Sequence, residues 1–268
     1  MLRTLGPMIF DGLSWLFFVV LVSPPMALCG ALLWRAYEAG VPIWLLPALV
    51  PALVPLFLVA LCLTTWLARL LVPRPRPGDH AFPISNDAVR WALHFALRRV
   101  LLGPPWERWI MGTNVLRWTA LHALGARTSL SAMMSSDVAI LDGWGLHVGP
   151  ESMVGAECSI ACHMIVGDRL IVAPVHLARR AQIRGGAKIA SGVTVGDSAV
   201  VGPLCRLRPN ASVGAKARLG MQVDVGVGAT IGAGARVGDR AVIEAGAVVA
   251  DGARVPPDGR VSNSGSGR

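Results

Sequence analysis

The chain has 268 residues, of which 53% are hydrophobic and only 15% are charged, and its formal net charge is +9. This composition is too apolar for an ordinary soluble protein of that length. The positive charge lies near apolar segments, and the sequence contains no nucleic-acid-binding motif. The charge therefore favours a membrane surface over nucleic acid as the partner. The five cysteines lack zinc-ligand spacing, and we expect them to be reduced and structural in a cytoplasmic setting.

Two apolar runs occupy the N-terminal quarter of the chain. Residues 13–34 and 41–68 contain no charged side chain, and each is long enough to cross a hydrocarbon core of about 30 Å as a helix. A cleaved signal is the alternative for the first run, but a second span following at once favours a retained hairpin. Tryptophans stand near the ends of both runs, as an interfacial belt requires: Trp15, Trp34, Trp44 and Trp66.

The second run contains Pro47, Pro51 and Pro55, spaced four residues apart. Proline lacks a backbone N–H and clashes with the preceding turn, so we expect a kink there. Basic residues begin at Arg69, directly after this run, and the positive-inside rule then places both termini and the second half of the chain in the cytoplasm. The predicted location is a bacterial inner membrane, with the repeats described below facing the cytoplasm.

An amphipathic segment follows the second apolar run. Ser85 or Asn86 can cap a helix there, and Arg90, His94 and Arg98 recur every four residues along it. The pattern predicts a basic stripe on an otherwise apolar rod, typical of a helix lying at the bilayer interface.

A six-residue repeat dominates the second half of the chain. An aliphatic residue stands at every sixth position from Ile183 to Val255, and a small or Val residue stands two positions before each, as Ala229 does before Ile231. The pattern predicts a β-helix, in which each coil buries its aliphatic side chains by stacking on the next. An earlier set of aliphatic residues also recurs every six positions, but it is one residue out of phase with the later set: Val148, Val154, Ile160, Val166 and Val172. The change of phase falls between Val172 and Leu177.

These repeats resemble those of the hexapeptide-repeat acyltransferases, which implies a left-handed parallel β-helix with three hexads per coil. Residues 74–262 also resemble the membrane-embedded C-terminal region of poly-lysine-synthetase-like nonribosomal peptide synthetases, through "RPRPGDHAFPISNDAVRWALHFALRRVLL", "MGTNVLRWTALHALGARTSL" and "RVPPDGRV". The expected fold is mainly β, preceded by helices. Its predicted parts are a transmembrane hairpin (1–72), interfacial helices (73–127), the β-helix (128–262) and a flexible tail (263–268).

The superfamily resemblance implies that a histidine acts as general base, and His163 is the candidate because it stands off the inward pattern. We expect His176, at the slip, to orient or bind substrate, and Asp168 to pair with His163 or Arg169. Three carboxylates are candidates to orient His163, and the sequence does not choose among them: Asp137, Asp142 and Glu157. His163 and His176 are too few for a three-histidine zinc site, so no metal is expected.

Three arginines, Arg218, Arg236 and Arg254, follow one another at intervals of three hexads, the length of one coil. They should stack on one face about 4.8 Å apart. Because like charges at this spacing repel, either acidic side chains lie between them or an anion binds. The candidate acids are Asp224, Asp239 and Glu244. A coenzyme A phosphate or a lipid head group is the expected anion. Asn263 is the remaining candidate for cofactor binding, although Ser264 replaces the proline that many soluble members have next to it.

The predicted function is membrane-anchored transfer of an acyl group from a thioester to an amine or hydroxyl. The donor is acyl-CoA or a carrier-bound thioester, and the acceptor is amphipathic or linked to membrane lipid. Peptide-bond formation from aminoacyl thioesters is the second hypothesis, and a non-catalytic scaffold at the membrane is the third. The superfamily resemblance also implies a homotrimer.

Overall fold

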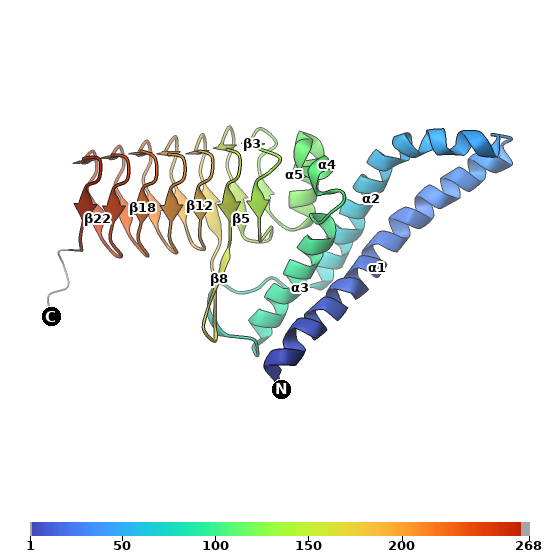
Figure 1. The fold of residues 1–268 in the computed structure, drawn as a ribbon, viewed down its shortest axis with the longest axis horizontal. Helices are drawn as coiled ribbons and strands as arrows, with labels where there is room; N and C mark the ends of the chain where they lie inside the picture. The colour runs from blue at the N-terminus through green and yellow to red at the C-terminus, as the bar shows by residue number, and fades with distance from the viewer. Residues whose placement is uncertain (1, 264–268) are drawn as a thin grey trace. The chain divides into compact units, whose positions relative to one another are not determined.

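A computed structural model describes residues 2–263, except for the side chains of residues 2–10 and 13. The chain forms two compact units: Met1–Arg74 with Arg90–Gly125, and Pro75–Val89 with Ala126–Arg268. The first is helical and the second is a β-helix (Figure 1). Segment 75–89, which we grouped with the interfacial helices, thus joins the β-helix unit. The predicted tail after Asn263 lies outside the described residues.

The helical unit contains two helices long and apolar enough to cross a membrane, judged by length and composition: Ser14–Glu38 and Ile43–Leu71. Leu21 and Leu61 are buried where the two pack together, and the Thr64 hydroxyl donates a hydrogen bond to the Leu21 carbonyl at 3.0 Å. The helical elements are α1 (Leu2–Glu38), the 3₁₀ helix η1 (Ile43–Leu49), α2 (Val50–Leu71), α3 (Asn86–Leu101), α4 (Glu107–Gly112) and α5 (Asn114–Ala123).

The proline-rich start of the second span is a 3₁₀ helix that continues into an α-helix. Pro47 lies inside η1, Pro51 lies in the first turn of α2, and Pro55 lies further inside α2. The first turn of a helix has unpaired N–H groups, so Pro51 costs no hydrogen bond there. The predicted irregularity is therefore placed at the junction of η1 and α2.

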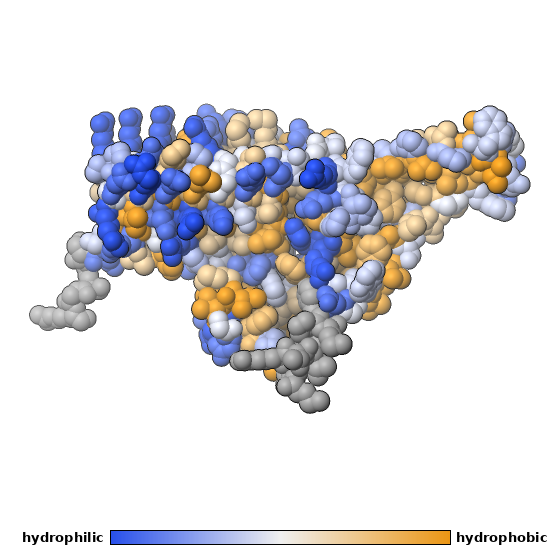
Figure 2. All heavy atoms as spheres, in the orientation of Figure 1, coloured by the Kyte–Doolittle hydropathy of each residue, from blue (hydrophilic) through white to orange (hydrophobic). Residues whose placement is uncertain are grey.

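Apolar side chains cover much of the outer surface of the helical unit, as the orange areas of Figure 2 show. Trp15 is 69% exposed and Trp44 is 74% exposed. An apolar patch of this extent on a soluble protein marks an interaction surface.

Helix α3 differs from the predicted exposed stripe. The Ser85 hydroxyl accepts a hydrogen bond from the Ala88 N–H at 3.1 Å, which makes Ser85 the helix cap. His94, however, is only 4% exposed, and its burial lowers its pKa to about 4. The assignment of His94 to an exposed polar stripe was wrong. Tertiary packing buries this face of α3, and the periodicity of the sequence does not distinguish a buried face from a solvent-exposed one.

Up to residue 263 the β-helix consists of three parallel sheets of seven strands each, which we call the first, second and third faces (Figure 1). The first face contains β2 (Arg127–Thr128), β5 (Leu146–Val148), β10 (Val175–Leu177), β13 (Thr194–Val195), β16 (Ser212–Val213), β19 (Thr230–Ile231) and β22 (Val248–Val249). The second contains β3 (Met133–Met134), β6 (Met153–Val154), β11 (Gln182–Ile183), β14 (Val200–Val201), β17 (Arg218–Leu219), β20 (Arg236–Val237) and β23 (Arg254–Val255). The third contains β4 (Ala139–Ile140), β7 (Ser159–Ile160), β12 (Lys188–Ile189), β15 (Arg206–Leu207), β18 (Asp224–Val225), β21 (Val242–Ile243) and β24 (Arg260–Val261).

The predicted repeat register is confirmed in the regular coils. Ile183 pairs with Val201, one coil further on. The aliphatic Ile231 and the small Ala229 are both fully buried, as expected for two inward positions of one hexad. The core of this unit is thus a stack of aliphatic layers that grows with each coil.

The phase slip has a different origin from the one the sequence suggested. From Leu177 to its register partner Val195 the chain runs three hexads, but from Val148 to Leu177 it runs five hexads less one residue. The excess is a hairpin of β8 (His163–Val166) and β9 (Arg169–Val172), which β1 (Gly78–Ala81) joins to form a three-stranded antiparallel sheet.

This insertion is one residue short of two hexads, so it shifts the phase of the repeat by one. Val166 and Val172 belong to the hairpin strands β8 and β9 and not to the coils. Their agreement with the earlier phase of the repeat is therefore a coincidence of spacing.

A second, smaller irregularity lies directly beside the hairpin. Between the register partners Thr128 and Val148 the chain has two residues more than the three hexads of a regular coil. The extra residues lie between β4 and β5, where the chain passes from the third face to the first. The hairpin leaves the next coil at the same place, between β7 and β10. We call this edge of the prism the insertion corner.

Candidate active site

The two irregularities of the insertion corner bring Asp142 and His163 together. Asp142 Oδ2 lies 2.6 Å from His163 Nδ1 and accepts a hydrogen bond from the Cys162 N–H at 2.8 Å. The Asp142 side chain is 1% exposed, whereas that of His163 is 14% exposed. Asp142 is one of the three carboxylates that the sequence offered as partners of His163. It reaches the histidine because it lies in the two-residue insertion between β4 and β5.

This arrangement suits a general base. A buried carboxylate accepts the Nδ1–H of the imidazole and thereby holds the ring in the tautomer whose Nε2 carries a lone pair. The same carboxylate stabilises the imidazolium that forms when Nε2 takes up a proton. The partial exposure of His163 leaves the ring in contact with solvent.

Cys162, next to His163, is not equipped to act as a nucleophile. Burial raises the pKa of its thiol, and the nearby Asp142 charge raises it further. A thiolate is the reactive form of cysteine, so Cys162 remains protonated and contributes packing at the base of the hairpin.

Asp168 lies away from His163, between the two hairpin strands. His163 pairs with Val172 at the open end of the hairpin, while Val166 pairs with Arg169 at the end that holds Asp168. Val166 stands three residues along β8 from His163, about 10 Å away, and Asp168 lies beyond it in the turn.

The structure therefore pairs His163 with Asp142 and not with Asp168. Arg169, the other predicted partner of Asp168, forms its ion pair with Asp79. The Asp168 backbone carbonyl accepts a hydrogen bond from the Phe82 N–H at 2.7 Å, which helps to hold β1 against the hairpin.

His176 lies on the first face and pairs with His147, which is not among the predicted site residues. The two Nδ1 atoms are 2.9 Å apart, and the rings meet edge to face with centroids 4.3 Å apart. His147 follows the Asp142 segment, and His176 follows the hairpin. Both histidines therefore lie just beyond the segments that hold Asp142 and His163. The signal that was missed is the length of the hairpin insertion, one residue short of two hexads, which puts His147 in register with His176.

The predicted arginine column is present. Arg218, Arg236 and Arg254 are register partners on successive strands of the second face, and all three are exposed. The candidate acids have other contacts: Asp224 pairs with Arg208, Glu244 pairs with Arg260, and Asp239 accepts the Met221 N–H. Within residues 2–263 no carboxylate forms an ion pair with the column.

The residues predicted to bind the cofactor are not gathered in one place. The arginine column lies on the second face, which is opposite the insertion corner in a three-faced prism. Asn263 follows β24 at the same corner as His163, but at the far end of the stack, where its side chain lies over Gly246.

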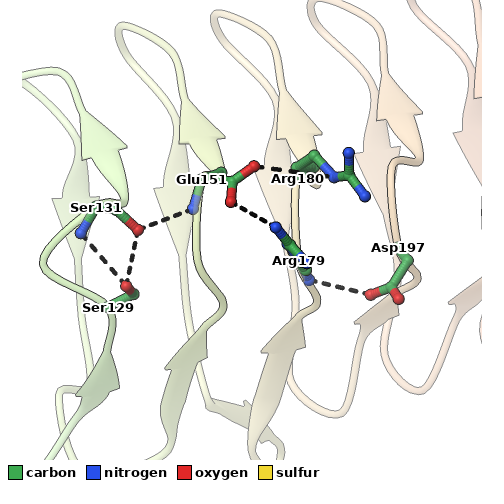
Figure 3. A network of polar contacts seen from close by, with 6 residues as sticks. All are labelled: Ser129, Ser131, Glu151, Arg179, Arg180 and Asp197. Carbon is green, nitrogen blue, oxygen red and sulfur yellow. Dashed lines mark hydrogen bonds and ion pairs between the residues drawn. The ribbon is translucent and has the colours of Figure 1, made fainter.

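Arg179 and Arg180, at the edge between the first and second faces, pair with the carboxylate of Glu151, in contrast to the arginine column. Figure 3 shows a network in which Arg179 Nη2 donates to Glu151 Oε1 at 2.7 Å and the Arg179 N–H donates to Asp197 at 3.1 Å. The hydrogen bond from Arg179 lowers the pKa of Glu151. Ser129 and Ser131 extend the network to the first coil. Exposed pairs of this kind contribute little stability.

Within the described part of the chain, no three His, Cys, Asp or Glu side chains are grouped so that they could hold a metal ion.

No family model matches the chain, and no curated protein matches it. Solved structures do resemble it. The perosamine N-acetyltransferase PerB from Caulobacter crescentus, in complex with CoA and GDP-perosamine, has 23% identity over 56% of this chain and 64% of its own, with a TM-score of 0.36. The UDP-N-acetylglucosamine O-acyltransferase LpxA from Moraxella catarrhalis has 16% identity over 50% and 63%, with a TM-score of 0.33. The acetyltransferase domain of PglB from Neisseria gonorrhoeae has 21% identity over 57% and 65%, with a TM-score of 0.27.

The structures named above are thus acetyltransferases and acyltransferases, and the chain covers less than two thirds of each. Because all three identities and TM-scores are low, the activity of this chain does not follow from them. The resemblance to poly-lysine-synthetase-like regions stays a prediction.

Proposed function

We propose that the chain is an acyltransferase in which His163 is the general base and Asp142 orients it. The observation that carries this proposal is the 2.6 Å contact between a buried carboxylate and a partly exposed imidazole. It is built at the insertion corner, the only corner of the described coils that is irregular. A scaffold needs neither of the two insertions, because the regular coils further along the chain stack without any.

In the proposed reaction, His163 Nε2 removes the proton of an acceptor amine or hydroxyl as that nitrogen or oxygen attacks the thioester carbonyl carbon. A tetrahedral intermediate forms, and its collapse breaks the carbon–sulfur bond. The departing thiolate takes the proton from the His163 imidazolium, which returns the base to its starting form. The Asp142 side chain accepts the hydrogen bond from His163 Nδ1 throughout and stabilises the imidazolium. The donor is acyl-CoA or a carrier-bound thioester.

The acceptor would be amphipathic or linked to membrane lipid. Two helices of sufficient length and apolarity support a membrane anchor, as do the exposed tryptophans near their ends. In this proposal the bacterial inner membrane holds the chain and the β-helix faces the cytoplasm. His147 and His176 would bind the acceptor, because they present ring nitrogens beside the insertion corner.

The test uses membranes that contain the full chain and acyl-CoA labelled in the acyl group. The variant His163→Asn should reduce transfer of label to endogenous acceptors by about 100- to 10,000-fold, the range for loss of a general base. The matched control is His122→Asn, on α5, which should retain the wild-type rate. Equal rates for His163→Asn and wild type would contradict the proposal.

A further inference from the structure

The arginine column on the second face is placed for a ligand other than an acyl donor bound at His163 of the same chain. Along the stack, β17, which holds Arg218, is the third strand beyond β6, and β6 directly precedes β7 and the hairpin. At about 4.8 Å per coil, Arg218 lies roughly 14 Å further along the axis than His163, on the opposite side of the prism. A donor whose thioester reaches His163 of the same chain is therefore not the ligand of these guanidinium groups.

The surface beside the column is open because the neighbouring positions carry no long side chain. Gly220, Gly238 and Pro256 stand two residues after the three arginines. A Cβ on Gly238 would collide with the backbone at Pro256 and Pro257 of the next coil. Glycine is thus required there by the coil spacing, and it leaves a strip of exposed backbone next to the guanidinium groups.

A surface pocket forms at this strip, in the last two coils of the second face. Its volume is about 350 Å³. The residues that line it are Arg236, Val237, Gly238, Arg254, Val255 and Pro256. Two like charges therefore face the same concavity, and the acids that could have neutralised them have other partners.

We propose that Arg218, Arg236 and Arg254 bind an anion that carries two or more phosphate groups. Guanidinium groups hold phosphate oxygens through paired N–H donors, and an array repeating every coil matches a ligand whose charges are also repeated. Three stacked cations without counter-ions repel one another, and a polyphosphate relieves that repulsion. Both a soluble nucleoside diphosphate and a lipid whose head group carries two phosphates have this chemistry.

The chain provides a matched control for general electrostatic attraction. Arg208, Arg240 and Arg260 are also exposed on the β-helix, but each is paired with a carboxylate, at distances of 2.7 Å. Replacing either set of three with glutamine lowers the net charge by the same amount. Only the first set removes the proposed ligand contacts.

The experiment titrates inorganic pyrophosphate into the full chain in neutral detergent by calorimetry, at low and at physiological salt. Wild type should bind saturably. The triple variant R218Q/R236Q/R254Q should lose affinity by at least about tenfold, while R208Q/R240Q/R260Q should stay within about twofold of wild type. Thermal unfolding of each variant checks that the β-helix is intact.

Two competition arms then distinguish the sources of the phosphate. Displacement of pyrophosphate by ADP supports a nucleotide, and displacement by micelles doped with cardiolipin, which carries two phosphates, supports a lipid head group. The proposal is overturned if wild type shows no saturable binding, or if both triple variants lose affinity equally, since the attraction would then be a property of the net charge.

Discussion

Asp142 and His163 are separated by 21 positions in the sequence, yet their side chains meet at 2.6 Å. The contact exists because two successive coils are lengthened at the same corner, slightly in the first and by nearly two hexads in the second. A regular stack would put an inward or turn residue at both positions. The proposed site is therefore a consequence of where the repeat is broken, and this makes its parts separable by mutation.

Asp142→Asn should reduce acyl transfer by about 100-fold or more, because an amide neither holds the imidazole tautomer as firmly nor stabilises the imidazolium. The side chain still accepts the Cys162 N–H, so the coil should remain folded. The measurement is the rate of label transfer from acyl-CoA, with thermal unfolding as the check on folding. Asp137→Asn, which alters an exposed carboxylate of the same coil, is the control. An unchanged rate in Asp142→Asn would assign that carboxylate a purely structural role.

Removing the hairpin should abolish activity and leave the β-helix folded. Deletion of residues 164–174 together with His163→Gly restores a coil of three hexads, brings Leu177 to the hexad position after Ile160, and supplies glycine at the turn. The downstream coils show that such a coil stacks without an insertion. Circular dichroism should retain the β signal, and transfer should fall to background. Loss of the β signal would show instead that the hairpin is part of the folding unit.

His94 should make the protein less stable in mild acid. Its pKa is about 4 in the folded state, compared with about 6.5 in an unfolded chain. Below pH 6.5 the unfolded state binds a proton that the folded state does not, so stability decreases as pH falls from 6.5 towards 4. The loss is about 1.4 kcal/mol per pH unit at most.

His94→Gln should remove this component, and the test compares unfolding of the two proteins in detergent between pH 7 and pH 4.5. The free energies should differ in slope, with the variant showing the flatter dependence. Parallel curves would mean that His94 gains a proton in the folded state as readily as in the unfolded one.

His147 and His176 should affect acceptor binding more than the chemical step. His176→Gln is expected to raise the KM for the acceptor several-fold with little change in kcat, because the ring lies beside the insertion corner and its hydrogen bond goes to His147. The double variant with His147→Gln should cost less than the two single changes combined, since the pair shares one hydrogen bond. A fall in kcat comparable to that of His163→Asn would instead place His176 in the proton transfer.

Spacing along the chain was sufficient to predict the repeat, its inward positions and the arginine column, because each depends on one regular structure. Ile183 and Val201, or Arg218 and Arg236, must be neighbours once a coil contains three hexads. The apolar segments could be located in the same way, since the ability to cross a bilayer depends on length and composition alone.

The position of the proposed site, in contrast, depends on packing between coils. A spacing counted in sixes cannot distinguish a slip of one residue from an insertion of nearly two hexads, and the hairpin valines Val166 and Val172 happened to continue the rhythm. The choice of Asp142 over two other carboxylates and the burial of His94 likewise depend on how separate coils or helices pack. His163 contacts Asp142 because two successive coils carry insertions at the same corner. The six-residue spacing does not predict this contact, because it forms only when the coils stack.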